Sequence, residues 1–305
     1  MFMNSIFPKS FAHAAIISPA GPADKMRVES GAALLREWGM KVTIMPHVFS
    51  GTRENYLSAS AAERLSDLHA CWADSSIDLA LCARGGFGSA HLLPEIDWQL
   101  LRSRPLPLIG YSDITALHMA MLKMNVGIPV AAPMAAKLCE AVIEDKFAEY
   151  TADYCRAAMH GLPIQIKSPD GGNPIRIIKP GCVSALPLVA NLAVMVTLCG
   201  TEYFPDVAGR VLILEDLNEP AYRIDRYLTQ LKQSGVLSKC AGIAFGEFLD
   251  CGTQVELQTI FHKAAESVNG PVITGFPFGH GLPVVSIRMD RHFRITGSGE
   301  VFIGE

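Results

Sequence analysis

The first half of the chain alternates short apolar runs with longer amphipathic stretches, and this alternation limits the folds available to it. The apolar runs have the length of buried strands and lie at residues 14–18, 41–45, 77–83, 106–110 and 129–132. Apolar residues recur at helical spacing over residues 26–38, 57–73 and 147–160. Strands separated by helices of this length predict an α/β domain with a doubly wound, mostly parallel sheet.

The composition changes after residue 160, where GLPIQIKSPDGGNPIRIIKP gathers proline, glycine and asparagine. We therefore expect an N-terminal domain at 1–160, a linker at 161–179 and a C-terminal domain at 180–305. Strand-like runs in this half lie at 176–178, 210–215, 242–247, 272–274, 293–295 and 300–303, and helical patterns at 221–234 and 254–268. They predict a smaller, mixed α+β domain of barrel-like form.

The bulk composition excludes several classes of protein. The net charge is −4 over 305 residues and the basic residues are scattered, so no nucleic-acid surface is expected. We expect no membrane span and no signal peptide, because no long uncharged apolar run occurs. The eight cysteines stand singly without a CxxC, which is typical of reduced cytoplasmic proteins and gives no disulfide framework or zinc site. Neither a metal nor a cofactor is expected.

Three reactive side chains stand where predicted strands end. Ser112 lies in GYSD after the strand-like run PLPLIG, Glu215 ends the strand VLILE, and His280 lies between glycines in FPFGHG. Ligands bind at this edge of open α/β sheets. A serine needs a base to become a nucleophile, histidine titrates in the right range, and a carboxylate can orient the imidazole. The sequence therefore predicts a serine hydrolase with these three residues.

Each of the three residues also has a plainer interpretation. Ser112 could cap a helix, and Ile114 replaces the second glycine of a G-x-S-x-G motif. Glu215 could be an ordinary strand-end carboxylate, with Asp216 and Glu219 as competitors for its role. His280 could be a core histidine, although such a residue would not need a glycine on each side.

A glycine-rich segment, ARGGFGSAHLL, separates a predicted strand from a predicted helix. It lacks G-x-G-x-x-G, so a dinucleotide site is not favoured. Its backbone N–H groups could instead bind an oxyanion, as could the N–H that follows the nucleophile. We expect this hole to be built from Asp113 and Gly86, with Gly85 as the alternative donor. The plainer interpretation is a turn that needs glycine for its backbone angles.

The segments ARGGFGSAHLLPEID, LIGYSDITALH, LILEDLNEPAYRIDRYLTQL and GFPFGHG together resemble the LD-carboxypeptidases, a serine peptidase family that includes the microcin C immunity peptidases. The resemblance runs from SPAGP near residue 18 to the C-terminus in the same order. It implies Ser112 as nucleophile, Glu215 as acid and His280 as base, with the serine on the N-terminal domain and the other two on the C-terminal domain.

The resemblance also implies a cytoplasmic homodimer that releases terminal D-Ala from an L,D bond in murein tetrapeptide, and hence a small peptide as the substrate. Two stretches depart from the family pattern. Val189 and Ala190 stand where the family usually has Gly-Gly before Asn-Leu, and Val284 follows Pro283 where many members have Asn. These departures affect the expected substrate more than the expected chemistry.

Two alternatives remain at this point: an immunity peptidase that cleaves peptidyl adenylate analogues, and a non-catalytic peptide- or nucleotide-binding protein. An exopeptidase needs a cation for the terminal carboxylate. Arg84 and Arg223 are the candidates, with Arg226 as a further one. Arg223 and Arg226 could equally be helix-surface residues that pair with Glu219 or Asp225.

Overall fold

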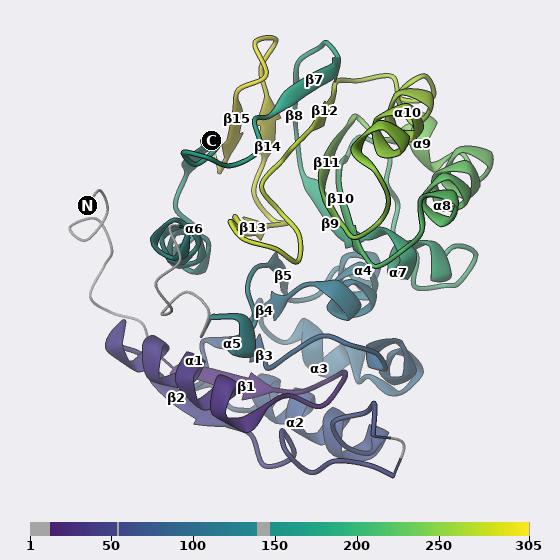
Figure 1. Ribbon diagram of the computed structural model, residues 1–305. Coiled ribbons are helices and arrows are strands. Elements are labelled where there is room, and N and C mark those ends of the chain that lie inside the picture. Colours follow the sequence, from purple (N-terminus) through teal and green to yellow (C-terminus); the bar gives the residue numbers. More distant parts are fainter. Residues whose placement is uncertain (1–12, 54, 139–146, 305) are drawn as a thin grey trace. The chain divides into compact units, whose positions relative to one another are not determined.

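A computed structural model describes residues 13–53, 55–138 and 147–304. The chain divides into two compact units, Met1–Arg156 and Ala157–Glu305 (Figure 1). Ser112 lies in the first unit, and Glu215 and His280 lie in the second. None of the described helices is both long enough and apolar enough to cross a membrane.

The first unit is built around five parallel strands in the order β5-β4-β3-β1-β2. The strands are β1 (His13–Ile17), β2 (Lys41–Ile44), β3 (Leu79–Cys82), β4 (Pro107–Gly110) and β5 (Ile128–Ala131). Strands β1 and β3 are buried along their whole length, as expected for the middle of a parallel sheet. The order is that of flavodoxin-like sheets and confirms the predicted doubly wound fold.

Helices connect these strands and form two packed groups. The helical segments are α1 (Lys25–Glu37), α2 (Ala61–Ala73), η1 (Ser89–Glu95), α3 (Trp98–Arg102), η2 (Ser112–Ile114), α4 (Thr115–Met124), α5 (Ala135–Leu138) and α6 (Ala148–His160). Helix α1 packs on α5, whereas α2, α3, α4 and η1 pack among themselves. Ser60 and Glu63 form a capping box at the start of α2, which explains why this helix begins later than its apolar pattern suggested.

The second unit contains two sheets rather than one barrel. One has the order β7-β12-β11-β10-β9 and is parallel except for β7; the other, β6-β15-β14-β8, is antiparallel. The strands are β6 (Ile164–Ile166), β7 (Arg176–Lys179), β8 (Val183–Ala185), β9 (Pro187–Asn191), β10 (Val211–Leu217), β11 (Gly242–Leu249), β12 (Val272–Thr274), β13 (Ile287–Arg288), β14 (Phe293–Ile295) and β15 (Val301–Ile303). The helices are α7 (Leu192–Thr197), α8 (Ala221–Gln233), α9 (Val236–Lys239) and α10 (Gln254–Ala265).

The segment that we expected to be a linker, 161–179, contributes strands to both sheets of the second unit. Strand β6 pairs with β15, and β7 pairs with β12. Pro and Gly cluster here because the chain turns between two short strands, so the composition change marks a turn-rich part of the second unit.

Helix α1 approaches α5 closely at Gly31. A Cβ atom added to Gly31 would lie 2.0 Å from the carbonyl oxygen of Ala135. That distance is far below any van der Waals contact, and the obstructing atom belongs to the backbone and cannot rotate away. The absence of a side chain at Gly31 therefore permits this packing.

We expect Gly31→Ala to lower the free energy of unfolding by about 1–3 kcal/mol, because the methyl group forces the two helices apart. Thermal unfolding followed by circular dichroism measures the effect. Ser30→Ala is the matched control, since Ser30 is an exposed neighbour in the same helix, and we expect it to stay within about 0.5 kcal/mol of the parent. A Gly31→Ala protein as stable as the parent would contradict this packing.

Candidate active site

Ser112 stands on a strained turn after β4, as the first residue of η2. Its φ angle is 63°, in the left-handed region that residues other than glycine rarely adopt. Just before it, Gly110 leaves room for Ile114, since a Cβ at Gly110 would lie 2.9 Å from the Ile114 side chain. A sharp strand-to-helix turn with a strained serine is the geometry of a nucleophile elbow, and such strain is concentrated at functional sites.

The glycine-rich loop after β3 packs directly against Ser112. A Cβ added to Gly85 would lie 3.0 Å from Ser112 Cβ and 3.1 Å from Ser112 Oγ, so a side chain at Gly85 would crowd the hydroxyl. Gly86 has a φ of 110°, which favours glycine, and Gly21 N–H donates to Gly85 O at 3.0 Å. The loop thus brings backbone to the serine at a distance that only glycine permits.

Asp113 fixes the start of η1 beside the turn. Its carboxylate accepts from Ser89 N–H at 2.9 Å, and its carbonyl oxygen accepts from Ser89 Oγ at 2.6 Å. The buried Arg64 guanidinium adds a second brace, donating to Pro19 O at 2.7 Å and Gly88 O at 2.8 Å. These bonds hold the residue after Ser112 against the start of η1, and tie Gly88 and Pro19 to the same guanidinium.

The histidine nearest to Ser112 in the sequence has a structural role. His118 in α4 is buried, and its Nε2 lies 3.0 Å from the Leu108 carbonyl oxygen in β4. Burial lowers the pKa of His118 to about 4, while the hydrogen bond to Leu108 opposes this shift. A neutral histidine committed to a backbone carbonyl is a poor general base.

In the second unit, Glu215 and His280 form a close pair. His280 Nδ1 lies 2.7 Å from Glu215 Oε2. The Glu215 side chain has no exposed surface, whereas 15% of the His280 side chain is exposed. A carboxylate oxygen only accepts, so Nδ1 carries the proton in this contact and neutral His280 has its lone pair on Nε2. The pair has the geometry of an oriented general base.

Glu215 is further held by an amide at the end of β9. Asn191 Nδ2 donates to Glu215 Oε1 at 3.2 Å and to Asp216 Oδ1 at 3.0 Å, while Asn191 Oδ1 accepts from Val194 N–H at the start of α7. Asp216 Oδ2 accepts from Ala193 N–H at 3.0 Å. Burial raises the pKa of Asp216 to about 6, against the effect of its hydrogen bonds with Leu217 and Asn191. Asp216, which the sequence left as a competitor for the acid, thus bonds to the backbone that begins α7.

The pKa of His280 lies above its ordinary value of 6.5. Burial is the largest single influence and lowers the pKa. The hydrogen bond with Glu215, together with the negative charges of Glu215, Asp216 and Glu247, outweighs it and stabilises the imidazolium.

The two arginines proposed for a terminal carboxylate both make contacts of their own. Arg84 Nη1 donates to Pro22 O at 3.0 Å. Arg223 Nη1 lies 3.2 Å from Glu219 Oε2 in an i,i+4 ion pair, which is the helix-surface arrangement that we considered as the alternative. The guanidinium of Arg226 lies over the Tyr222 ring, 5.5 Å from its centre.

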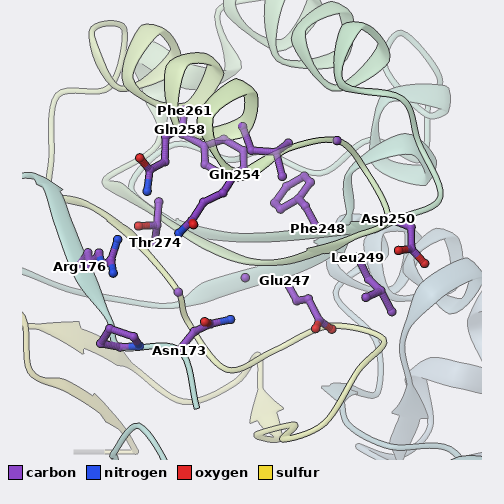
Figure 2. Close-up of a pocket in the computed structure, with 15 residues that line it drawn as sticks. Asn173, Arg176, Glu247, Phe248, Leu249, Asp250, Gln254, Gln258, Phe261 and Thr274 are labelled. Carbon is purple, nitrogen blue, oxygen red and sulfur yellow. The ribbon is translucent and has the colours of Figure 1, made fainter. Parts of the chain in front are cut away.

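A cavity of about 390 Å³ lies within the second unit, beside the end of β11 (Figure 2). Glu247, Phe248 and Asp250 line one side of it, and Gln254 and Gln258 of α10 line another. Among the residues that the structure describes, no group of three or more His, Cys, Asp or Glu is placed to hold a metal ion.

Sequence reasoning missed Ser89, which bonds to Asp113 in the first unit, and Asn191 and Glu247, which contact Glu215 and the His280 loop in the second. Asn191 follows Val189 and Ala190, the two positions at which the chain departs from the family pattern. Its place at a strand end just before a helix is a signal that could have found it. The roles predicted for Ser112, Glu215, His280, Gly86 and Asp113 remain predictions.

Comparisons with known proteins follow the same division of the chain. Residues 14–131 match the model of the LD-carboxypeptidase N-terminal domain, and residues 187–295 match that of the LD-carboxypeptidase C-terminal domain. A murein tetrapeptide carboxypeptidase of Pseudomonas aeruginosa is 32% identical over 88% of this chain and 87% of its own. A Streptomyces coelicolor protein named as a carboxypeptidase is 34% identical over 88% of this chain and 85% of its own.

Solved structures show the same fold. An MccF-like protein from Bacillus anthracis superposes with a TM-score of 0.88 at 24% identity, covering 97% of this chain and 98% of its own. The muramoyltetrapeptide carboxypeptidase from Oxalobacter formigenes gives a TM-score of 0.81 at 23% identity, covering 96% and 99%. Because models of both LD-carboxypeptidase domains match it and the Pseudomonas relative is 32% identical, the chain belongs to the LD-carboxypeptidase family and is a carboxypeptidase.

Proposed function

We propose that this protein hydrolyses an L,D-peptide bond and releases terminal D-Ala from murein tetrapeptide by way of an acyl-enzyme. The observation that carries the proposal is the 2.7 Å contact between His280 Nδ1 and the fully buried Glu215. It supplies an oriented base, and the strained turn at Ser112 supplies a matching nucleophile. The substrate is inferred from the Pseudomonas relative, which is named as a murein tetrapeptide carboxypeptidase.

In the proposed mechanism, His280 Nε2 takes the proton of Ser112 Oγ, and the oxygen attacks the scissile carbonyl. Glu215 stabilises the imidazolium that forms. The N–H groups of Asp113 and Gly86 stabilise the oxyanion, with Gly85 as the alternative to Gly86; one such donor is typically worth about 3–4 kcal/mol.

The tetrahedral intermediate collapses when His280 returns its proton to the departing amine of D-Ala. Water, deprotonated by the same histidine, then hydrolyses the ester and frees Ser112. We propose that Arg84 or Arg223 binds the terminal carboxylate of the substrate. Both are cations with exposed surface, and an exopeptidase must recognise that charge.

We also propose that the protein acts in the cytoplasm as a homodimer. The seven cysteines among the described residues are free thiols, which suits a reducing compartment. The homodimer rests on the family resemblance, and light scattering of the purified protein tests it.

A second candidate substrate, a peptidyl adenylate analogue, has one observation in its favour. The Phe87 ring is half exposed beside Gly86, and it makes edge-to-face contacts with Tyr56 at 5.8 Å and His91 at 5.0 Å. An exposed aromatic next to the proposed oxyanion loop could stack on a base. Cleavage of an aminoacyl sulfamoyl adenosine, with no D-Ala released from tetrapeptide at high enzyme concentration, would select this substrate.

We expect Ser112→Ala and His280→Ala to lower kcat for D-Ala release from murein tetrapeptide by at least about 10⁴-fold, because nucleophile and base act as a unit. Glu215→Gln should cost about 10²–10⁴-fold through loss of imidazole orientation. A coupled D-amino acid oxidase assay measures the release. Asp225→Asn is the control, since this carboxylate is exposed and pairs with Lys263 on α10. Full activity in Ser112→Ala would refute the mechanism.

The pH profile of kcat/KM should show an acid limb whose midpoint lies above 6.5. The imidazolium cannot accept the serine proton, so activity falls as the pH drops through the raised pKa of His280. In Glu215→Gln the carboxylate that stabilises the imidazolium is gone, and the limb of the residual activity should move to lower pH. A limb that stays in place in Glu215→Gln would assign the titrating group to another residue.

A further inference from the structure

Strand β11 carries an irregularity opposite Glu215. Leu214 pairs with Phe245 and Asp216 pairs with Phe248, so one residue of β10 faces two residues of β11, Gly246 and Glu247. This is the arrangement of a β-bulge. Bulges redirect a side chain out of the regular alternation of a strand and are frequent next to active sites. The bulge frees Glu247 from the register of its neighbours.

Glu247 contacts the loop that carries His280 on both sides of the histidine. Its N–H donates to Phe278 O at 2.8 Å, and its Oε2 accepts from Gly281 N–H at 2.5 Å. Figure 2 shows the Glu247 carboxylate turned toward the loop after β12. Glu247 therefore holds the loop at Phe278, before His280, and at Gly281, directly after it.

The two glycines beside His280 lie so close to the Glu247 side chain that neither position has room for a Cβ atom. A Cβ at Gly279 would lie 2.6 Å from Glu247 Cβ, and a Cβ at Gly281 would lie 2.5 Å from Glu247 Oε1. A side chain at Gly279 would push the loop off β11, and one at Gly281 would displace the Glu247 carboxylate from the loop. The G-H-G sequence therefore has a local cause, which is close contact with a carboxylate on β11.

We propose that Glu247 is a positioning residue that holds the His280 loop in its reactive orientation. Glu215 orients the imidazole through Nδ1, and Glu247 orients the backbone on which the imidazole is mounted. This inference rests on the proposed role of His280 as the base. Glu247 acts through His280 and takes no proton from the substrate.

The negative charges around His280 also support this role. The charged groups that act on His280 are Glu215 and Asp216 from β10 and Glu247 from β11, and all three raise its pKa against the effect of burial. Glu247 also lines the 390 Å³ cavity and is only half-buried, so its carboxylate is less isolated from solvent than Glu215. Its charge is consequently a weaker influence on the imidazole than that of Glu215, and its hydrogen bond to the loop is its main contribution.

Two substitutions separate these contributions. Glu247→Ala removes both the bond and the charge, and we expect kcat to fall by about 10–100-fold with KM within about threefold, because a small displacement of the base is costly. Glu247→Gln keeps an oxygen that can accept from Gly281 N–H. It should retain kcat within about fivefold on the pH plateau and move the acid limb to lower pH.

The matched control is Asp250→Asn. Asp250 is a carboxylate on the rim of the same cavity, it also has a left-handed φ of 55°, and asparagine tolerates that conformation. We expect its kcat, KM and pH profile to equal those of the parent. The pKa of His280, measured by NMR on protein labelled at its histidines, gives a readout that does not depend on turnover. It should fall in Glu247→Gln and stay unchanged in Asp250→Asn.

Parent-like kcat in Glu247→Ala, or a kcat in Glu247→Gln as low as that of Glu247→Ala, would overturn the proposal. If Glu247→Ala does not fold, Gly279→Ala decides in its place, because its methyl group would lie 2.6 Å from Glu247 Cβ and displace the loop: parent-like kcat there would overturn the proposal. His280→Ala separates this failure from that of the proposed function: substantial activity there removes the base assignment itself. An inactive His280→Ala beside parent-like Glu247 variants removes only the positioning role.

Discussion

The arrangement of the candidate site in the second unit depends on one interaction, the hydrogen bond from His280 to the buried carboxylate of Glu215. A carboxylate without solvent contact is costly unless its oxygens are satisfied. Here one oxygen contacts His280 Nδ1 and the other accepts from Asn191. The free-energy cost of burying Glu215 is thus offset only while His280 and Asn191 keep their places. This requirement couples the ends of β9 and β10 to the loop that carries His280.

The two units follow the same design. In each, glycines allow a loop to approach a side chain of the candidate site closely. Gly85 approaches the Ser112 hydroxyl, while Gly279 and Gly281 approach Glu247. The carboxyl edge of a parallel sheet offers such positions because the strands end together and the connections diverge there. The predicted nucleophile, Ser112, and the predicted base, His280, both stand on turns that neighbouring backbone and side chains hold in place.

Much of this could be predicted from the sequence, and the omissions have physical causes. The alternation of strands and helices in the first half was readable because a parallel sheet buries whole strands and leaves continuous apolar runs. The order of strands in the second unit was not readable, because short strands such as β6 and β8 carry little periodic signal. Composition alone made 161–179 look like a linker, although two of its segments are paired strands.

The candidate site shows the same limit. The glycines around His280 could be noticed, but their cause could not, since a bulge changes the register of β11 without leaving a mark in the pattern of AGIAFGEFLD. Glu247 therefore looked like an ordinary polar residue in an apolar strand. Likewise, Glu215 and Asp216 are adjacent carboxylates that are both buried. Only their partners, His280 for one and the start of α7 for the other, tell them apart.

The measurement that tests the account most directly is labelling with a fluorophosphonate, followed by mass spectrometry of the digested protein. The account predicts one modified residue, Ser112, with labelling abolished in Ser112→Ala and sharply slower in His280→Ala. An active parent protein in which Ser112 stays unmodified, or a His280→Ala protein labelled as fast as the parent, would contradict it.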